Sequence, residues 1–266
     1  MEIKDSFEGN GFYVFNTRAI ELERVRNASD GMDKIRDGEY DTGRPPENSP
    51  WNPGDDPARL CKIEQPQLGS KAVGELIRSP EIGEWAAHVT GADMIQVWWV
   101  QLLYKPPAAE KQPTPTKIGW HTDWQYWGKT WEDGSQLLTA WVALSDVDDS
   151  SGPMKFVAGS HQWEEITGGD FYSQDISEEE FALSPNRRWR EISALMDAGG
   201  MSLHDKRVLH GSSFNLSSSP RKSLAVHLRT DRSRPIDGQR AGLAKYVDDL
   251  DTAPIIYGKK LRAAFS

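Results

Sequence analysis

The chain has 266 residues, a formal net charge of −9 at pH 7 and a single cysteine, Cys61. This length can bury a sizeable core, and the acidic balance argues against nucleic acid or an anionic membrane as the main partner, because both demand a basic surface. A lone cysteine cannot form an internal disulfide, and neither a secretory signal nor an apolar run of about 20 residues is present, so we expect a cytoplasmic protein.

The first hundred residues predict helices more than strands. Residues 12–15, FYVF, are typical of a short strand, and Thr17 is a candidate cap for a helix that runs to about residue 29 and ends near Gly31. Residues 38–58 are rich in Gly, Pro and Asp, which predicts a long loop, either a lid or binding loop or a disordered surface insertion. A second helix is expected from Ser79 to Gly91, with proline at its first position.

The rest of the chain predicts short strands separated by turns. Their β-branched, aromatic or continuous apolar character favours strands at 94–104, 137–145, 154–160, 199–204 and 223–230. A helix is expected only at 177–184, SEEEFALS. This pattern indicates a sandwich or a barrel, and without repeats or a linker we expect one domain over residues 1–266.

The stretch IGWHTDWQYW, residues 118–127, places His121 and Asp123 one residue apart. Chance alone gives roughly half of one such HxD motif in a chain of this composition. On a strand, residues i and i+2 share a face, so the two side chains could bind one ion. His210 is the best candidate for a third ligand, which would complete the two-His-one-carboxylate set of non-heme Fe(II) oxygenases. Structural zinc is the alternative, but it favours four ligands and cysteine.

An iron oxygenase of this kind commonly needs a two-electron donor, and 2-oxoglutarate is the candidate here. Its distal carboxylate requires a bidentate cation, which arginine provides. Arg221 opens the segment RKSLAVHLRT, eleven residues after His210, so a turn between two strands would bring it close to the metal. An arginine at the start of a strand can equally be a surface residue.

The sequence resembles the phytanoyl-CoA dioxygenase-like family of Fe(II)/2-oxoglutarate-dependent oxygenases. The resemblance rests on segments that occur in the family's order from residue 7 to about residue 230: FEGNGFYVF, YKPP, HTD, LTAWVALSDVDDSSGPMKFVAGSH and HGSSFNLSSSPRKSLAVHLR. It implies a mainly β protein with flanking helices, whose core is a double-stranded β-helix, or cupin-like jelly roll.

The resemblance also implies roles for individual residues. In the family pattern, Fe(II) is bound by His121, Asp123 and His210. The 2-oxoglutarate is bound by Arg221 together with Ser212, Trp141 and Gln101. Trp141 and Gln101 could instead be ordinary core residues. Lys62 is a weaker assignment to the pocket. The remaining histidines are read as structural, with His161 in a turn, His88 exposed on a helix, His227 facing the core, and His204 unable to chelate together with Asp205.

The family's chemistry implies oxidation with dioxygen and release of succinate and CO2. Because Asp123 is present, the expected outcome is hydroxylation or another reaction begun by hydrogen abstraction, rather than halogenation. We expect a free small metabolite as substrate, with an acyl-CoA as the alternative. Strand alternation sends Trp120 and Trp124 to the core and favours pocket roles for three aromatic residues beyond the strand, Tyr126, Trp127 and Trp131.

Two other classes of function remain open from the sequence alone. A non-catalytic, cupin-like protein would keep HTD and His210 for a metal but would have no use for Arg221. A zinc hydrolase on the same fold would need no dioxygen.

Overall fold

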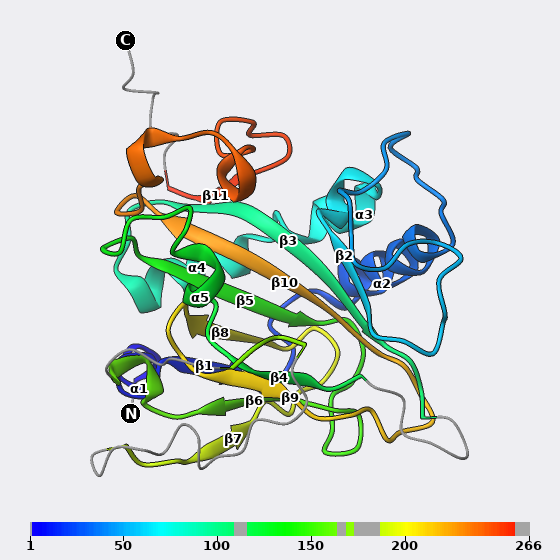
Figure 1. Ribbon diagram of the computed structural model, residues 1–266, viewed down its shortest axis with the longest axis horizontal. Coiled ribbons are helices and arrows are strands. Elements are labelled where there is room, and N and C mark those ends of the chain that lie inside the picture. Colours follow the sequence, from blue (N-terminus) through cyan, green and yellow to red (C-terminus); the bar gives the residue numbers. More distant parts are fainter. Residues whose placement is uncertain (1, 109–115, 164–168, 173–186, 259–266) are drawn as a thin grey trace.

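The computed structural model describes residues 2–108, 116–163, 169–172 and 187–258. The helix expected at 177–184 lies outside these ranges. Among the described residues, two antiparallel sheets and a set of helices form the fold (Figure 1). None of the described helices is both long and apolar enough to cross a bilayer.

The larger sheet has seven strands in its described part, and the strand order is β1-β8-β5-β10-β3-β11, with β2 also paired to β3. The strands expected at 12–15, 94–104, 137–145, 199–204 and 223–230 are confirmed. Their bounds are β1 Phe12–Phe15, β2 Cys61–Glu64, β3 Ile95–Lys105, β5 Leu137–Ala143, β8 Met201–Asp205, β10 Arg221–Thr230 and β11 Ile255–Tyr257.

The smaller sheet has the order β4-β9-β6-β7 and faces the larger one. Its strands are β4 Ile118–His121, β9 His210–Ser212, β6 Met154–Val157 and β7 Glu191–Ser193. Side chains from both sheets form one apolar cluster, in which Phe12 stacks on Phe156 at 4.4 Å between ring centroids. The expected sandwich of short strands is therefore confirmed.

Helices cover the outer face of the larger sheet. The α-helices are α1 Ile3–Asn10, α2 Leu22–Arg36, α3 Lys71–Leu76, α4 Pro80–Thr90 and α5 Trp124–Trp127, and the 3-10 helices are η1 Pro66–Leu68, η2 Ser160–Gln162, η3 Ile236–Gly238 and η4 Gly242–Ala244. The largest core cluster joins α2, α3 and α4 to the outward side chains of the strands, such as Leu224, Val226 and Leu228 of β10. The inward side chains of the same strands are thus left for the space between the sheets.

The predicted first helix is displaced in the structure. It begins at Leu22 rather than near Thr17, and it continues through Gly31 to Arg36. Gly31 does not end the helix because its missing side chain serves packing: a Cβ there would lie 2.4 Å from Ser70 Oγ at the start of α3. The second helix is as predicted, although Ser79 accepts a hydrogen bond from Arg24 (3.1 Å) and makes no capping bond.

The segment 38–58 forms no helix or strand, as expected, and it packs beside α2 and β2. Trp51 is buried in the outer core, 4% exposed, with the Arg36 guanidinium 5.6 Å from its ring. Glu47 holds the segment to the C-terminal part of the chain through Lys245 (2.8 Å) and Tyr246. No residue of 38–58 lines the main cavity, so its predicted role as a lid gains no support from these contacts.

Candidate active site

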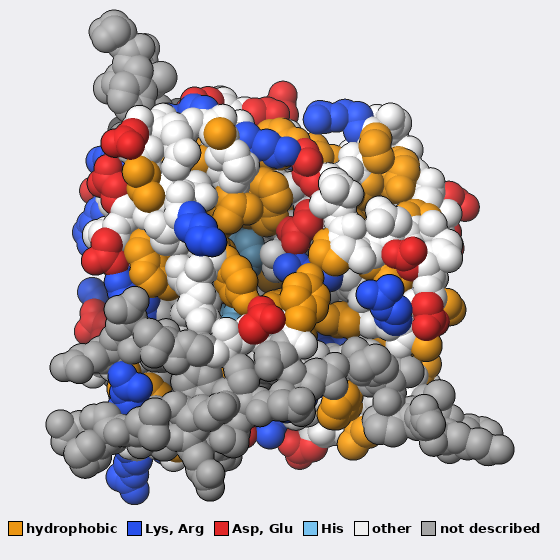
Figure 2. Space-filling model, viewed as in Figure 1, with side chains coloured by type: hydrophobic (Ala, Val, Ile, Leu, Met, Phe, Trp, Pro, Cys, Tyr) orange, Lys and Arg blue, Asp and Glu red, His pale blue; other side chains and the backbone are white. Residues whose placement is uncertain are grey.

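A cavity of about 430 Å³ lies between the two sheets. Figure 2 shows it as a hollow ringed mainly by hydrophobic side chains, with histidine in its depth. The wall comes from the inward faces of β2, β3, β5 and β10, from β4 and β9 opposite, and from Tyr126, Trp127, Phe171 and Tyr172. This placement explains why residues far apart in sequence meet in one site.

His121, Asp123 and His210 converge at one end of this cavity. One ligand atom from each lies within 4.8 Å of the other two, and all three residues are buried. His121 ends β4 and stands opposite His210 of β9 in the strand register. Asp123 differs from the prediction: it precedes α5 with helical backbone angles, so a turn, and not strand alternation, brings it beside His121.

The two histidines are oriented for metal binding through hydrogen bonds to backbone carbonyls. Nδ1 of His121 lies 2.7 Å from the carbonyl oxygen of Gly119, and Nδ1 of His210 lies 3.0 Å from that of Val208. A carbonyl only accepts, so each Nδ1 carries the proton and each Nε2 keeps a lone pair. Burial lowers the pKa of both imidazoles, which favours the neutral form that binds a metal.

Asp123 is held as a carboxylate by its surroundings. Burial alone would raise its pKa, but the hydrogen bond from His204 and the neighbouring imidazoles lower the pKa below the usual value. Its Oδ2 accepts a hydrogen bond from Thr139 Oγ1 (2.9 Å), and His204 Nε2 lies 3.4 Å from the same oxygen. Two neutral imidazoles and one ionised carboxylate are the donor set that suits Fe(II), so the residues fit this metal.

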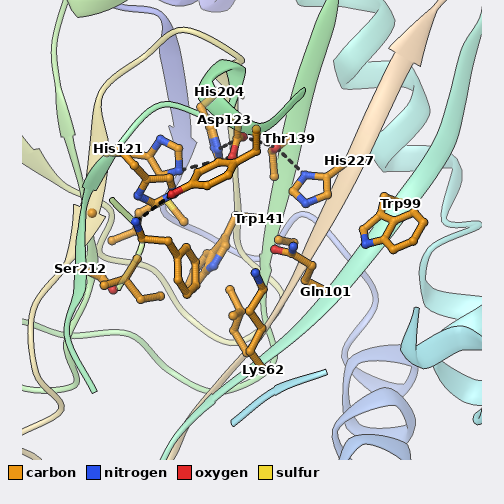
Figure 3. A pocket seen from close by; sticks show the side chains of 18 of the residues that line it. Lys62, Trp99, Gln101, His121, Asp123, Thr139, Trp141, His204, Ser212 and His227 are labelled. Carbon is orange, nitrogen blue, oxygen red and sulfur yellow. Dashed lines mark hydrogen bonds and ion pairs between the residues drawn. The ribbon is translucent and has the colours of Figure 1, made fainter. Parts of the chain in front are cut away.

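His204 and His227 also line this cavity, contrary to their reading as structural residues. His204 faces Asp123, and His227 Nδ1 lies 2.8 Å from Thr139 Oγ1 (Figure 3). A pattern in the sequence could have revealed His227, because positions 221, 223, 225 and 227 share the inward face of β10. His88 and His161 are absent from the cavity wall, as expected.

Arg221 lies at another part of the wall and has unused hydrogen-bonding capacity. It is 1% exposed, and its Nη1 donates to Ser223 Oγ (3.0 Å), whereas Nε and Nη2 have no partner. No described carboxylate lies within salt-bridge distance of it, and burial lowers its pKa to about 9. Trp141 packs under the guanidinium, whose Cζ lies 5.1 Å from the ring. A carboxylate from a ligand would satisfy this cation.

Lys105, which the sequence did not suggest, is a second buried cation beside Arg221. The two residues are paired in the register of β3 and β10, and Lys105 is fully buried. Burial and the charge of Arg221 lower the pKa of Lys105 well below its usual value. Its ammonium donates to Ser212 Oγ (2.8 Å) and to the carbonyl of Ser213. Ser212 therefore contacts Lys105 and lines the same cavity as Arg221.

The wall at β2 and β3 combines charge with aromatic surface. Lys62 Nζ lies 3.3 Å from Glu64 Oε1 and 4.3 Å from the centre of the Phe171 ring. Glu64 also accepts hydrogen bonds from Trp99 Nε1 (2.6 Å) and from Gln101 Nε2 (3.3 Å). Lys62 and Gln101 therefore line the cavity as predicted, and Glu64 joins them because i and i+2 on β2 point inward together.

The three aromatic residues proposed for the pocket lie in different places. Tyr126 and Trp127 line the cavity, but Trp131 does not. Trp131 is 0% exposed and packs against Trp98 at 5.3 Å between ring centroids, because the chain turns inward after α5. Trp120 and Trp124 lie away from the cavity but are only partly buried, so they are not the core residues expected. Trp120 packs on Trp189 (5.2 Å), and the Lys206 side-chain nitrogen lies 3.9 Å from the Trp124 ring.

Comparison with solved structures confirms the jelly-roll fold. The epimerase SnoN from nogalamycin biosynthesis, described as a non-heme alpha-ketoglutarate-dependent enzyme, matches with a TM-score of 0.66 and 20% identity over 88% of this chain and 84% of that chain. EctD from S. alaskensis in its apoform matches with a TM-score of 0.65 and 20% identity over 87% and 77% of the two chains.

Sequence comparison finds relatives that this chain matches over part of their length. The ectoine dioxygenase of Halomonas elongata is 30% identical over 239 residues, which is 82% of this chain and 66% of that protein. A probable alpha-ketoglutarate-dependent hypophosphite dioxygenase of Stutzerimonas stutzeri is 26% identical over 187 residues, 67% of this chain and 60% of that protein. The chain thus matches less than two thirds of the length of these relatives.

The family resemblance inferred from the sequence is tested by a model of the whole family. The model described as phytanoyl-CoA dioxygenase matches residues 7–223, which include His121, Asp123, His210 and Arg221. Because this match spans most of the chain, the protein belongs to the phytanoyl-CoA dioxygenase family.

Proposed function

We propose that the protein is a non-heme Fe(II)- and 2-oxoglutarate-dependent oxygenase that oxidises a small molecule. The observation that carries this proposal is the meeting, in one cavity, of the His121-Asp123-His210 cluster and the unpaired guanidinium of Arg221. A metal-binding protein without turnover would have no use for a buried cation that lacks a partner. The relatives named above, an alpha-ketoglutarate-dependent hypophosphite dioxygenase and an ectoine dioxygenase, support this proposal.

The roles of the residues follow from their contacts. His121, Asp123 and His210 would hold Fe(II), leaving coordination positions open, and Arg221 would bind the distal carboxylate of 2-oxoglutarate. Lys105 positions Ser212 for the same carboxylate through its hydrogen bond to Ser212 Oγ. With dioxygen, iron and 2-oxoglutarate would supply the oxidising power, with succinate and CO2 as co-products.

The chain itself orients these groups and excludes water from them. Thr139 and His204 fix the Asp123 carboxylate, and the carbonyls of Gly119 and Val208 fix the two imidazole rings. The presence of Asp123 favours hydroxylation, or another outcome of hydrogen abstraction, over halogenation. One oxygenase domain over residues 1–266, acting in the cytoplasm without nucleic acid, remains our interpretation.

For the substrate, we favour a free small metabolite over an acyl-CoA. Lys62 and Glu64 form a small polar area of the cavity wall, and aromatic side chains surround it. Such a wall suits a compact polar molecule better than a long acyl chain. The substrates printed for the two sequence relatives, ectoine and hypophosphite, are likewise small molecules.

Succinate formation tests the proposed function. The purified protein is incubated with Fe(II), ascorbate, 2-oxoglutarate and dioxygen, and succinate is measured with and without candidate substrates. We expect succinate that depends on Fe(II), on dioxygen and on Arg221, and none from Asp123→Ala. Activity that zinc supports without dioxygen would instead favour the hydrolase, and 2-oxoglutarate-independent metal binding without turnover would favour the cupin-like protein.

A further inference from the structure

Asp123, Thr139 and His227 form a chain of hydrogen bonds whose direction can be deduced. Thr139 Oγ1 lies 2.9 Å from Asp123 Oδ2 and 2.8 Å from His227 Nδ1. An ionised carboxylate only accepts, so the single hydroxyl proton of Thr139 points to Asp123. Oγ1 must then accept from His227, and Nδ1 of His227 carries a proton.

The other ring nitrogen of His227 therefore has a free lone pair. Burial lowers the pKa of His227 to about 4, so the ring is neutral and Nε2 is unprotonated. No described residue hydrogen-bonds Nε2, although the side chain is only 4% exposed. His227 lines the cavity, and Figure 3 shows its ring turned toward the space that Gln101 and Trp141 also face.

Aromatic side chains surround the ring of His227. His227 packs against Trp127 and Trp98, with centroids 4.9 and 5.5 Å away, and it is paired in register with Trp99. These neighbours are aromatic, so Nε2 of His227 is a hydrogen-bond acceptor within a largely apolar part of the wall. Because His227 lines the cavity, a ligand there that carries a hydrogen-bond donor can pair with this nitrogen, and each such hydrogen bond contributes about 0.5–1.5 kcal/mol.

We propose that His227 Nε2 accepts a hydrogen bond from a hydroxyl or N–H group of the substrate and is a specificity-determining residue of this oxygenase. The inference rests on the proposed function and deepens it, because it assigns the substrate to donor-bearing polar molecules and not to hydrocarbon chains. Hydrogen bonds through Thr139 also connect Asp123 to His227, so one network orients both the metal ligand and the residue that contacts the substrate.

The tautomer can be measured without any turnover. In protein labelled with 15N at histidine, a long-range proton–nitrogen NMR spectrum separates protonated from unprotonated ring nitrogens, and His227→Gln identifies the signals of His227. We expect Nδ1 protonated and Nε2 unprotonated in the metal-free protein at pH 7.5. Thr139→Val should abolish this preference, whereas Thr139→Ser should keep it. A proton on Nε2 in the unmodified protein would overturn the proposal.

Two substitutions distinguish the contributions of Nδ1 and Nε2 of His227. His227→Asn places its amide near the former Nδ1 and can still donate to Thr139, whereas His227→Gln places an oxygen near the former Nε2. Affinity for Co(II), followed by tryptophan fluorescence, should change less than about threefold in His227→Asn and fall about tenfold or more in His227→Phe, because a ligand-orienting bond is lost. Equal Co(II) affinities in all variants would contradict the network.

The substrate contact is tested with matched pairs of small alcohols and amines and their O-methyl or fully N-methylated counterparts. The parent compounds should stimulate 2-oxoglutarate consumption, and the methylated ones should not. For the best compound, KM should rise about tenfold in His227→Asn, the size of one hydrogen bond, and less in His227→Gln. Stimulation by the methylated compounds, or equal KM in the two variants, would refute the contact. Absence of any 2-oxoglutarate turnover would count against the proposed function, while the NMR result would still decide the tautomer.

Discussion

Replacing Arg221 by methionine should stabilise the protein without 2-oxoglutarate and abolish its response to 2-oxoglutarate. Arg221 is a buried cation with one hydrogen bond to Ser223 and two nitrogens that have no partner. Methionine keeps most of the aliphatic length and removes the charge. The structure thus predicts that stability and ligand binding change in opposite directions.

The magnitude follows from the pKa and the lost contact. Burial lowers the pKa of Arg221 from 12.5 to about 9, which corresponds to a penalty of about 5 kcal/mol on the charged form. The lost hydrogen bond to Ser223 offsets about 1.5–3 kcal/mol of this. We therefore expect the free energy of unfolding to rise by about 2–3.5 kcal/mol, which for a chain of this size raises Tm by about 4–14 °C.

Thermal unfolding is the assay, in the presence of Zn(II) as an inert substitute for iron and with increasing 2-oxoglutarate. The unmodified protein should gain about 2.7 kcal/mol at a ligand concentration of 100 Kd, and Arg221→Met should gain nothing. Lys222→Met is the matched control, because Lys222 is the next residue on β10 but pairs with Asp33 outside the cavity. An Arg221→Met variant that is less stable than the unmodified protein and still responds to 2-oxoglutarate would refute this reasoning.

Three further predictions concern the metal, the pH and the aromatic core. Alanine at His121, Asp123 or His210 should abolish succinate formation and weaken Fe(II) binding, and normal activity in all three would disprove the cluster. Because the pKa of buried His227 falls from 6.5 to about 4, the unfolded chain binds the proton more readily. The free energy of unfolding should then decrease by about 3 kcal/mol as the pH falls from 6.5 toward 4. Urea unfolding at several pH values measures this dependence, and His227→Gln should weaken it. Trp131→Ala should reduce the free energy of unfolding by about 3–5 kcal/mol without raising the KM of folded enzyme, since Trp131 is buried outside the cavity wall.

The sequence indicates that His121, Asp123, His210 and Arg221 lie close together, because short-range spacing and the pairing of neighbouring strands determine their positions. It predicts less where tertiary packing decides. Asp123 follows a helical turn, and Gly31 continues a helix because Ser70 packs against it. His227 illustrates the same limit, since its strand periodicity indicates an inward position but only the contact with Thr139 reveals its role.

Lys105 and Glu64 show what sequence patterns miss at the site itself. Glu64 lines the cavity and Lys105 is fully buried beside Arg221, whereas a polar residue in a strand is ordinarily assigned to the solvent face. Their functional surroundings appear only when β2, β3 and β10 are aligned, which pairs Lys105 with Arg221 and Glu64 with Gln101. Such cross-strand pairs depend on long-range register, which local periodicity does not contain.

In the proposed oxygenase, the metal cluster and Arg221 hold the two ends of one ligand. Calorimetric titration of 2-oxoglutarate under anaerobic conditions, with and without Fe(II), tests this arrangement most directly. A ligand anchored at both ends should bind the Fe(II)-loaded protein at least about tenfold more tightly than the metal-free protein, and Asp123→Ala should lose most of this difference. Equal affinity with and without Fe(II), or the same metal dependence in Arg221→Met as in the unmodified protein, would contradict the account.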